Sequence, residues 1–241
     1  MYQLKGRVRY SEIGEDGRLT LTGVINYLQD CTTFHSEDSG VGIHHLKQQK
    51  RAWLLSSWRI RVYRYPEFGE AITVGTWHSG AKGICAYRNF IIEDSRGERV
   101  AKADSVWVFV STEDGLPQRI RAEDVAPYGV PGTPLAMKGG EGKILLPAEY
   151  ETGSPIVVSA HHIDTNHHVN NAQYVEIARE AAGVSEPIGR LRVEYKKAAV
   201  LKDVLTPKIS RDEQGVTVAL CNDSGRPSAM VRMEKAREEE E

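Results

Sequence analysis

The chain has 241 residues, of which 40% are hydrophobic and 27% are charged. This composition is typical of a soluble globular protein and excludes collagen-like, mucin-like and wholly disordered chains. Lys and Arg number 31 against 33 Asp and Glu, and the net charge is −2. No global basic field therefore favours binding to nucleic acid or anionic lipid. The length allows one large domain or two small domains.

The sequence has only weak signals for a membrane span, a signal peptide or disulfide bonds. The longest unbroken apolar run covers only 106–110, whereas a membrane span needs about 18 residues. The first residues form no apolar signal region. Three widely spaced cysteines, Cys31, Cys85 and Cys221, predict neither a disulfide framework nor a CxxC metal pair. We expect a cytoplasmic protein without a cofactor or a metal.

The front of the chain, 1–130, has the pattern of one domain. One helical stripe comprises Leu21, Val24, Ile25 and Leu28, and Thr20 or Thr22 is available as its N-cap. Strand-like runs follow near 58–62, 72–74, 84–92 and 103–110. These elements predict an antiparallel sheet with one helix on it.

A stretch rich in Gly and Pro, 131–155, has no apolar period and is predicted to be a linker. Behind it, 156–234 has the same element order as the front. A strand is followed by a helix capped by Asn170 or Asn171, and then by four strand-like runs. The charge run 235–241 is predicted to be a solvated tail.

The two halves therefore indicate an internal duplication. Aligning Tyr27 with Tyr174 matches the two helices. A short helix buried against a curled antiparallel sheet is the arrangement called a hotdog. We predict an α+β fold of the tandem, or double, hotdog type.

One segment, 161–174, concentrates reactive side chains, including four of the eight His residues. Three interpretations compete. The segment could be a polar loop that caps the following helix, or a metal site formed by His161, Asp164 and His168. The third is a catalytic loop leading into a helix N-terminus, with Asp164, Asn166 and His168 on one side if the stretch is extended. We favour the third, and His161, His162 and His167 are interpreted as solvated or supporting residues.

The motif Asp-x-Asn-x-His-Val-Asn-Asn at 164–171, followed by Tyr174, resembles that of the acyl-[acyl-carrier-protein] thioesterases, plant and bacterial hydrolases of fatty acyl thioesters. Further matches lie in the family's order, at 25–30, 63–70, 76–80 and 103–108. The resemblance covers most of the chain and implies a tandem hotdog fold. It also implies that Asp164, Asn166 and His168 are catalytic.

The chain departs from the plant pattern on the next strand. Plant members have Glu and Cys in a Tyr-Arg-Arg-Glu-Cys run, where this chain has Ala198 and Ala199. Alanine can neither attack a carbonyl nor accept a proton, so a thiolate mechanism on that strand is excluded. We infer hydrolysis by activated water, with the carbonyl polarised by N–H groups at the start of the helix and by Asn166. Either Asp164 or His168 is the general base.

The resemblance also implies where substrate binds. We expect Asn170, Asn171 and Tyr174 to bind the substrate, and the acyl chain to lie against the front helix stripe of Leu21, Val24, Ile25 and Leu28. The partner implied is a small acidic carrier protein that bears phosphopantetheine. The candidate basic residues that would meet it are Lys47, Lys50, Arg51, Arg59, Arg61, Arg64, Arg190, Arg192, Lys196, Lys197 and Lys202.

Other functions on this fold remain open. An acyl-CoA thioesterase would present the same pantetheine arm, whereas a hydroxyacyl dehydratase matches the motif poorly. A non-catalytic acyl-thioester sensor would be expected to carry an effector module, and none is visible. Neither membrane nor nucleic acid is expected as a partner, and the chain is expected to be a monomer or a homodimer.

Overall fold

The computed structural model describes residues 1–137, 139 and 142–236. The chain divides into two compact units. The first comprises Met1–Ser56 and Ile60–Lys138, and the second comprises Ser57–Arg59 and Gly139–Glu241. The predicted domain limits stay a prediction.

The predicted charged tail is described only at its start. Lys235 is the last residue of the final strand, and 237–241 lie outside the described residues, as do 138 and 140–141 of the predicted linker. Elsewhere in that linker, Ile144 is buried against Ala219 and Met230 of the second unit. Parts of 131–155 therefore pack against a domain core.

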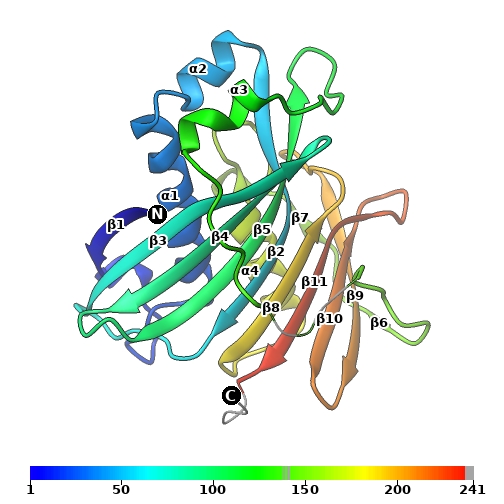
Figure 1. The fold of residues 1–241 in the computed structure, drawn as a ribbon. Helices are drawn as coiled ribbons and strands as arrows, with labels where there is room; N and C mark the ends of the chain where they lie inside the picture. The colour runs from blue at the N-terminus through cyan, green and yellow to red at the C-terminus, as the bar shows by residue number, and fades with distance from the viewer. Residues whose placement is uncertain (138, 140–141, 237–241) are drawn as a thin grey trace. The chain divides into compact units, whose positions relative to one another are not determined.

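The first unit is built on one sheet with the strand order β1-β3-β4-β5-β2 (Figure 1). Neighbours along β1, β3, β4 and β5 are antiparallel. The strands are β1 (Tyr2–Arg7), β2 (Arg51–Val62), β3 (Ala71–Lys82), β4 (Cys85–Asp94) and β5 (Arg99–Ser111).

One long helix, α1 (Leu21–Asp38), packs on this sheet through β3. The predicted stripe is confirmed as its buried face, and the N-cap is Thr20, whose hydroxyl accepts from Gly23 N at 3.0 Å. The shorter helical elements of this unit are η1 (Tyr10–Glu12), α2 (Ile43–Gln48), α3 (Ala122–Val125) and η2 (Ala126–Tyr128).

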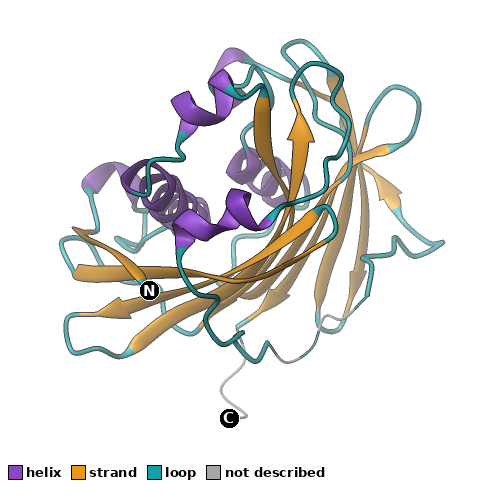
Figure 2. Ribbon diagram, turned by 45° about the horizontal axis from the view of Figure 1, so that its top comes forward, coloured by secondary structure: helices purple, strands orange, loops and turns teal. Residues whose placement is uncertain are grey.

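The second unit repeats this plan with a shorter helix. Its sheet has the order β8-β11-β10-β9-β6, and β7 also pairs with β9. The elements are β6 (Glu151–Thr152), β7 (Ile156–Val157), η3 (Ala160–His162), α4 (Asn171–Ala181), β8 (Ile188–Tyr195), β9 (Val204–Asp212), β10 (Gly215–Cys221) and β11 (Pro227–Lys235). Each unit thus combines long strands with few helices (Figure 2), which confirms the predicted α+β tandem hotdog.

The duplication is correct, but the predicted alignment of Tyr27 with Tyr174 is wrong. The two 3₁₀ turns begin at Tyr10 and Ala160, and the two long helices begin at Leu21 and Asn171. Both pairs differ by 150 positions, whereas the predicted pairing differs by 147. Three residues are close to one helical turn, so the buried stripes still matched when the alignment was wrong.

Candidate functional site

The predicted catalytic segment is a tight turn and not an extended strand. Residues Ile163 and Val169 pair as an isolated antiparallel bridge. Between them, Asp164 N donates to His168 O at 2.8 Å and His167 N donates to Asp164 O at 3.1 Å. His167 adopts a left-handed backbone with φ of 62°. The condition under which alternate residues would project to one side, an extended stretch, is therefore not met.

The Asp164 side chain is fixed by this turn. One carboxylate oxygen, Oδ1, accepts from the backbone N–H of Asn166 at 2.8 Å and from that of His168 at 3.3 Å. Among the described residues, nothing donates to the other oxygen, Oδ2. The turn therefore holds a half-buried carboxylate in one orientation and leaves one oxygen for water or substrate.

The other two predicted catalytic side chains are less constrained. Asn166 is exposed and His168 is half-buried. Within the described part of the chain, no hydrogen bond or ion pair joins the Asp164 carboxylate to the His168 ring, since the two residues meet through the backbone N–H of His168. The structure brings the three residues onto one turn without forming an Asp–His side-chain pair.

The start of α4 is capped from within the chain. Asn170 Oδ1 accepts from Ala172 N at 2.8 Å, and the Asn170 carbonyl accepts from Gln173 N at 3.0 Å. These bonds use N–H groups that we expected to polarise the thioester carbonyl. The cap predicted by the simplest interpretation is thus present beside the candidate catalytic residues.

Tyr174 is a structural anchor for the segment behind the turn. Its ring is buried, and its hydroxyl accepts from Ala199 N at 2.7 Å. The Ala199 carbonyl in turn accepts from Val169 N at 2.9 Å. Burial raises the pKa of Tyr174 to about 12, so the hydroxyl stays protonated. Sequence reasoning missed this link, because only the fold brings Ala199 to Tyr174.

Asn171 takes part in a second link of this kind. Its carbonyl accepts from the Tyr195 hydroxyl at 2.9 Å, and the rings of Tyr195 and Tyr174 lie 5.8 Å apart. The end of β8 is thereby tied to the first residue of α4. Ala198, which follows the end of β8, is exposed.

His162 supports the turn from its N-terminal side. The ring is buried, and Nδ1 accepts from Ser159 N at 3.0 Å. The His162 carbonyl accepts from Asn170 N at 2.8 Å. Burial, followed by the neighbouring His161, lowers the pKa of His162, so the neutral imidazole is favoured. His162 is therefore a supporting residue of the turn.

The predicted acyl-binding residues of the front half all lie in the first unit. Leu21, Val24, Ile25 and Leu28 are buried on α1. They belong to the core between that helix and its sheet. A role in binding an acyl chain stays a prediction.

The cysteines have no features of nucleophiles. Cys31 and Cys221 are buried, and all three are free thiols. Burial raises the pKa of Cys31 to about 12, which opposes thiolate formation. The alternative metal site is not formed either, since the described residues contain no group of three or more His, Cys, Asp or Glu placed to hold a metal ion.

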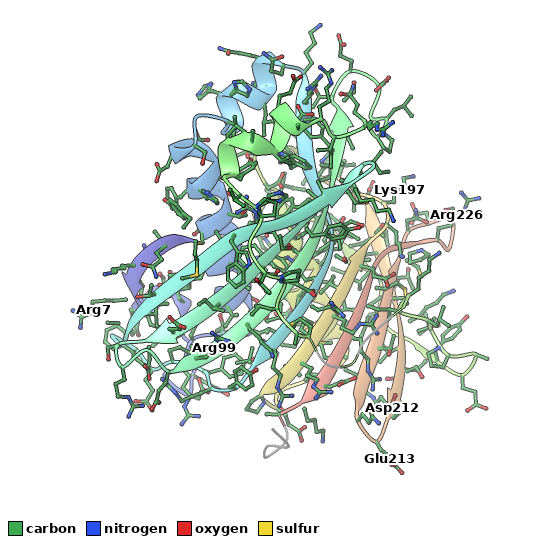
Figure 3. The ribbon with its side chains drawn as sticks, in the orientation of Figure 1. Arg7, Arg99, Lys197, Asp212, Glu213 and Arg226 are labelled. Carbon is green, nitrogen blue, oxygen red and sulfur yellow. The ribbon has the colours of Figure 1, made fainter. Side chains whose placement is uncertain are left out.

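Several predicted basic contacts are already neutralised. Lys50 pairs with Glu113, Arg51 with Asp124, Arg64 with Glu70, and Lys196 with Glu194. Lys197, which follows the end of β8, is exposed (Figure 3). Lys202 is exposed as well. Within the described residues, neither of these two lysines forms an ion pair.

No helix in the described ranges, 1–137, 139 and 142–236, combines the length and apolar character needed to cross a membrane.

Two family descriptions match the chain in succession. The acyl-ACP thioesterase N-terminal domain matches residues 1–128, and the acyl-ACP thioesterase C-terminal domain matches residues 147–234. The second match contains the 163–169 turn.

Curated relatives share about a quarter of the sequence. A chloroplastic palmitoyl-acyl carrier protein thioesterase of Gossypium hirsutum is 24% identical over 89% of this chain and 57% of its own length. A chloroplastic dodecanoyl-[acyl-carrier-protein] hydrolase of Umbellularia californica is 26% identical over 82% of this chain and 56% of its own length. The chain thus spans a little over half the length of these relatives.

Solved structures share the fold across almost the whole chain. An acyl-ACP thioesterase from Bacteroides thetaiotaomicron superposes with a TM-score of 0.86 at 21% identity, covering 96% of both chains. A 12:0-ACP thioesterase from Umbellularia californica gives 0.82 at 21% identity, covering 97% of this chain and 96% of that one. At this identity the likeness establishes the fold.

Proposed function

Because this chain belongs to the acyl-ACP thioesterase family, matching both of its domains in order, we propose that it hydrolyses the thioester bond of fatty acyl-[acyl-carrier-protein] and releases the free fatty acid. The observation that carries this proposal is the Asp164 turn, which lies inside the C-terminal domain match and presents an oriented carboxylate. Thioesters suit such a site, because a thiolate leaves without strong protonation.

In the proposed mechanism, Asp164 is the general base. Its Oδ1 accepts from two backbone N–H groups. Oδ2 takes a proton from the attacking water, whose oxygen bonds to the thioester carbon, and the carbon–sulfur bond then breaks to release the thiolate. A fixed orientation of the base supports this role, because catalysis needs the reacting groups held in place beforehand. The Asn166 amide and the His168 ring then contact the substrate and stabilise the developing oxyanion. Both side chains are free to adjust to it.

The direct test is a thiol-release assay with acyl-carrier-protein and acyl-CoA thioesters of graded chain length. We expect turnover on the carrier-protein thioesters, with Asp164→Asn lowering kcat by roughly 10²–10⁴. Turnover confined to CoA thioesters would instead support the acyl-CoA thioesterase alternative. Tight acyl binding without thiol release would refute hydrolysis and favour a sensor.

The choice of base has its own test in the pH profile of kcat/KM. If Asp164 is the base, His168→Gln lowers kcat/KM but leaves the shape of its pH profile unchanged. A profile whose shape changes in His168→Gln would assign the base to histidine.

The proposed carrier-protein contact involves Lys197 and Lys202. They flank the segment whose Ala199 bonds to Tyr174 and Val169, and they are exposed. Lys197→Glu should raise KM for the acyl-carrier-protein several-fold at low salt, and this effect should shrink at high salt. The uncharged acyl-pantetheine is the control substrate, and an equal KM change on it would argue against docking at this site.

A further inference from the structure

A second polar cluster lies in the first unit, beside the C-terminal part of α1, and the proposed hydrolysis has no use for it. At its centre is Arg88 of β4, which is only 7% exposed. Its Nη1 donates to His35 Nδ1 at 2.8 Å and to Thr76 Oγ1 at 3.3 Å. The guanidinium carbon lies 4.8 Å from the centre of the Tyr128 ring.

This cation has no internal counter-ion. In the described part of the chain, no carboxylate forms an ion pair with Arg88, and the acidic groups that act on it are Tyr128 and Cys31. Burial lowers the pKa of Arg88 to about 10, which leaves it charged at neutral pH. The Cys31 thiol, with its pKa raised to about 12, stays neutral.

The neighbouring imidazoles do not supply negative charge either. Burial, and then the charge of Arg88, lowers the pKa of His35 to about 4 and also lowers that of His78. Both rings are therefore neutral at pH 7. A buried charge is costly unless it is paired, so the cluster favours an anion from outside the chain.

The guanidinium keeps its binding edge available. Nη1 uses its hydrogens on His35 and Thr76, which leaves the Nε and Nη2 hydrogens, the pair that grips a carboxylate with two parallel bonds. Neither of these two nitrogens is among the fully buried side-chain atoms without a hydrogen bond in the described part of the chain, so this edge retains accessible surface.

Arg64, another arginine of this unit, has the carboxylate partners that Arg88 lacks among the described residues. Arg64 donates to both oxygens of Glu70, at 2.9 and 2.6 Å, and to Asp94 at 3.1 Å. Arg64 is the more exposed of the two and has two carboxylates. The more deeply buried Arg88 has none, which is the reverse of what charge burial alone would favour.

Aromatic rings lie beside the guanidinium group. The His35 ring meets Tyr128 edge-on with centroids 5.3 Å apart, and Tyr2 stacks on His35 at 4.8 Å. Walls of this kind suit an apolar molecular body next to the charge. We propose that Arg88 anchors a binding site for a single carboxylate carried on an apolar body.

Two sources could supply that carboxylate. One is the free fatty acid that the proposed function releases, and the other is a second carboxylate at the far end of an acyl chain. The chemistry recognised at Arg88 is the same in both cases. Binding at this site does not depend on turnover, so its failure and the failure of the proposed hydrolysis are distinguishable.

Calorimetric titration of the full chain with octanoate below its micelle concentration tests the site. We expect saturable binding of octanoate, at least tenfold weaker binding of the uncharged octanol, and at least a tenfold loss of octanoate affinity in Arg88→Gln. Arg99→Gln removes one charge from the adjacent strand β5 and should leave the affinity unchanged, as should Asp164→Asn. Absence of octanoate binding, or equal affinity in wild type and Arg88→Gln, would overturn the proposal.

Arg88→Lys keeps the proposal testable if Arg88→Gln fails to fold. Lysine retains the charge but not the two-pronged edge, so the variant should fold and still lose affinity about tenfold. Octanoate affinity equal to wild type in a folded Arg88→Lys variant would overturn the bidentate site.

Two kinetic measurements distinguish the two sources of the carboxylate. Inhibition of hydrolysis by octanoate that Arg88→Lys relieves would identify the released fatty acid as the ligand. A higher kcat/KM for a thioester with a terminal carboxylate than for its methyl-ended analogue, again lost in Arg88→Lys, would identify the acyl chain itself. Either result supports the site. Octanoate affinity that is the same in wild type, Arg88→Gln and Arg88→Lys contradicts it.

Discussion

The two halves of the chain contain the same turn, and only one copy has the candidate chemistry. In each unit a 3₁₀ turn leads into an isolated bridge, Ile13 with Leu19 or Ile163 with Val169. The backbone bonds match as well, with Gly14 N to Arg18 O at 2.9 Å and Asp164 N to His168 O at 2.8 Å. The backbone is therefore a shared scaffold, and the side chains on it differ.

The difference between the copies lies at the positions that could react. Where the second turn has Asp164, the first has Gly14, and His168 is replaced by Arg18. Asp16 takes over the capping of the first turn by accepting from Arg18 N at 3.1 Å. A carboxylate can thus stabilise such a turn from more than one position. A carboxylate at 164 is therefore one of two ways in which these turns are capped, and its choice in the second turn is consistent with a functional role.

The largest effect should separate these two carboxylates. Asp164→Ala is expected to lower kcat by roughly 10²–10⁴, because it removes the oriented oxygen. Asp16→Ala removes the matching cap in the first turn and should cost about 1 kcal/mol of stability with turnover unchanged. Thiol release and urea unfolding measure the two quantities, and equal activity in the two variants would refute a catalytic Asp164.

The helix caps offer a smaller effect. Thr20→Ala and Asn170→Ala each remove an N-cap bond, to Gly23 N and Ala172 N respectively. Each should lower the free energy of unfolding by about 0.5–2 kcal/mol in urea titrations. Asn170→Asp restores the cap. If the Asn170 amide contacts substrate, this variant regains stability but not turnover, whereas full recovery of both would limit Asn170 to capping.

Substitution at the left-handed position of each turn should change the free energy of unfolding by about 1 kcal/mol. Gly17 has φ of 75° and His167 has φ of 62°, a conformation that costs a side chain about 1–2 kcal/mol. His167→Gly should raise the free energy of unfolding by up to about 1 kcal/mol, since the greater freedom of unfolded glycine offsets part of the gain. Gly17→Ala should lower it by a similar amount. Unchanged turnover in His167→Gly would exclude a catalytic role for that ring.

The smallest effect concerns pH. His162 caps the second 3₁₀ turn where Glu12 caps the first, and the pKa of His162 is lowered in the folded chain by burial and by His161, with Glu180 opposing. Its contribution to stability is complete above pH 6.5 and is lost as the pH falls towards the lower folded pKa. His162→Glu should therefore flatten part of the fall in thermal midpoint between pH 7 and 5. The remaining fall is expected from His35 and His78, whose pKa values are lowered too, and an unaltered profile would contradict the assignment to His162.

The elements could be predicted because their signals are local. The stripe of α1 and the alternating strands follow from apolar periodicity, which burial on one face imposes on a helix or a strand. The register of the duplication could not be predicted this way, because a shift of three residues preserves the helical stripe. Gly17 and His167 give the correct register only once their shared φ sign is known.

The candidate functional residues also fall into two groups, those that a sequence motif identifies and those that only the fold brings together. Asp164, Asn166 and His168 are close in sequence, so a motif suffices to find them. Other contacts join positions far apart in the sequence. Tyr174 bonds to Ala199, 25 residues away, and Arg88 bonds to His35, 53 residues away. Arg88 also lies over the Tyr128 ring. No periodicity encodes such pairs.

The sequence by itself determined the α+β class, the repeated element order and the residue types available for the proposed hydrolysis, because these depend on local patterns and composition. Only the tertiary structure decided that the candidate catalytic segment is a turn, that Asn170 accepts from N–H groups in the first turn of α4, and that Arg88 is buried without a carboxylate partner in the described residues. The physical reason is that hydrogen bonding and desolvation depend on which distant side chains share a space. That information exists only after the sheet and helix of each unit have packed.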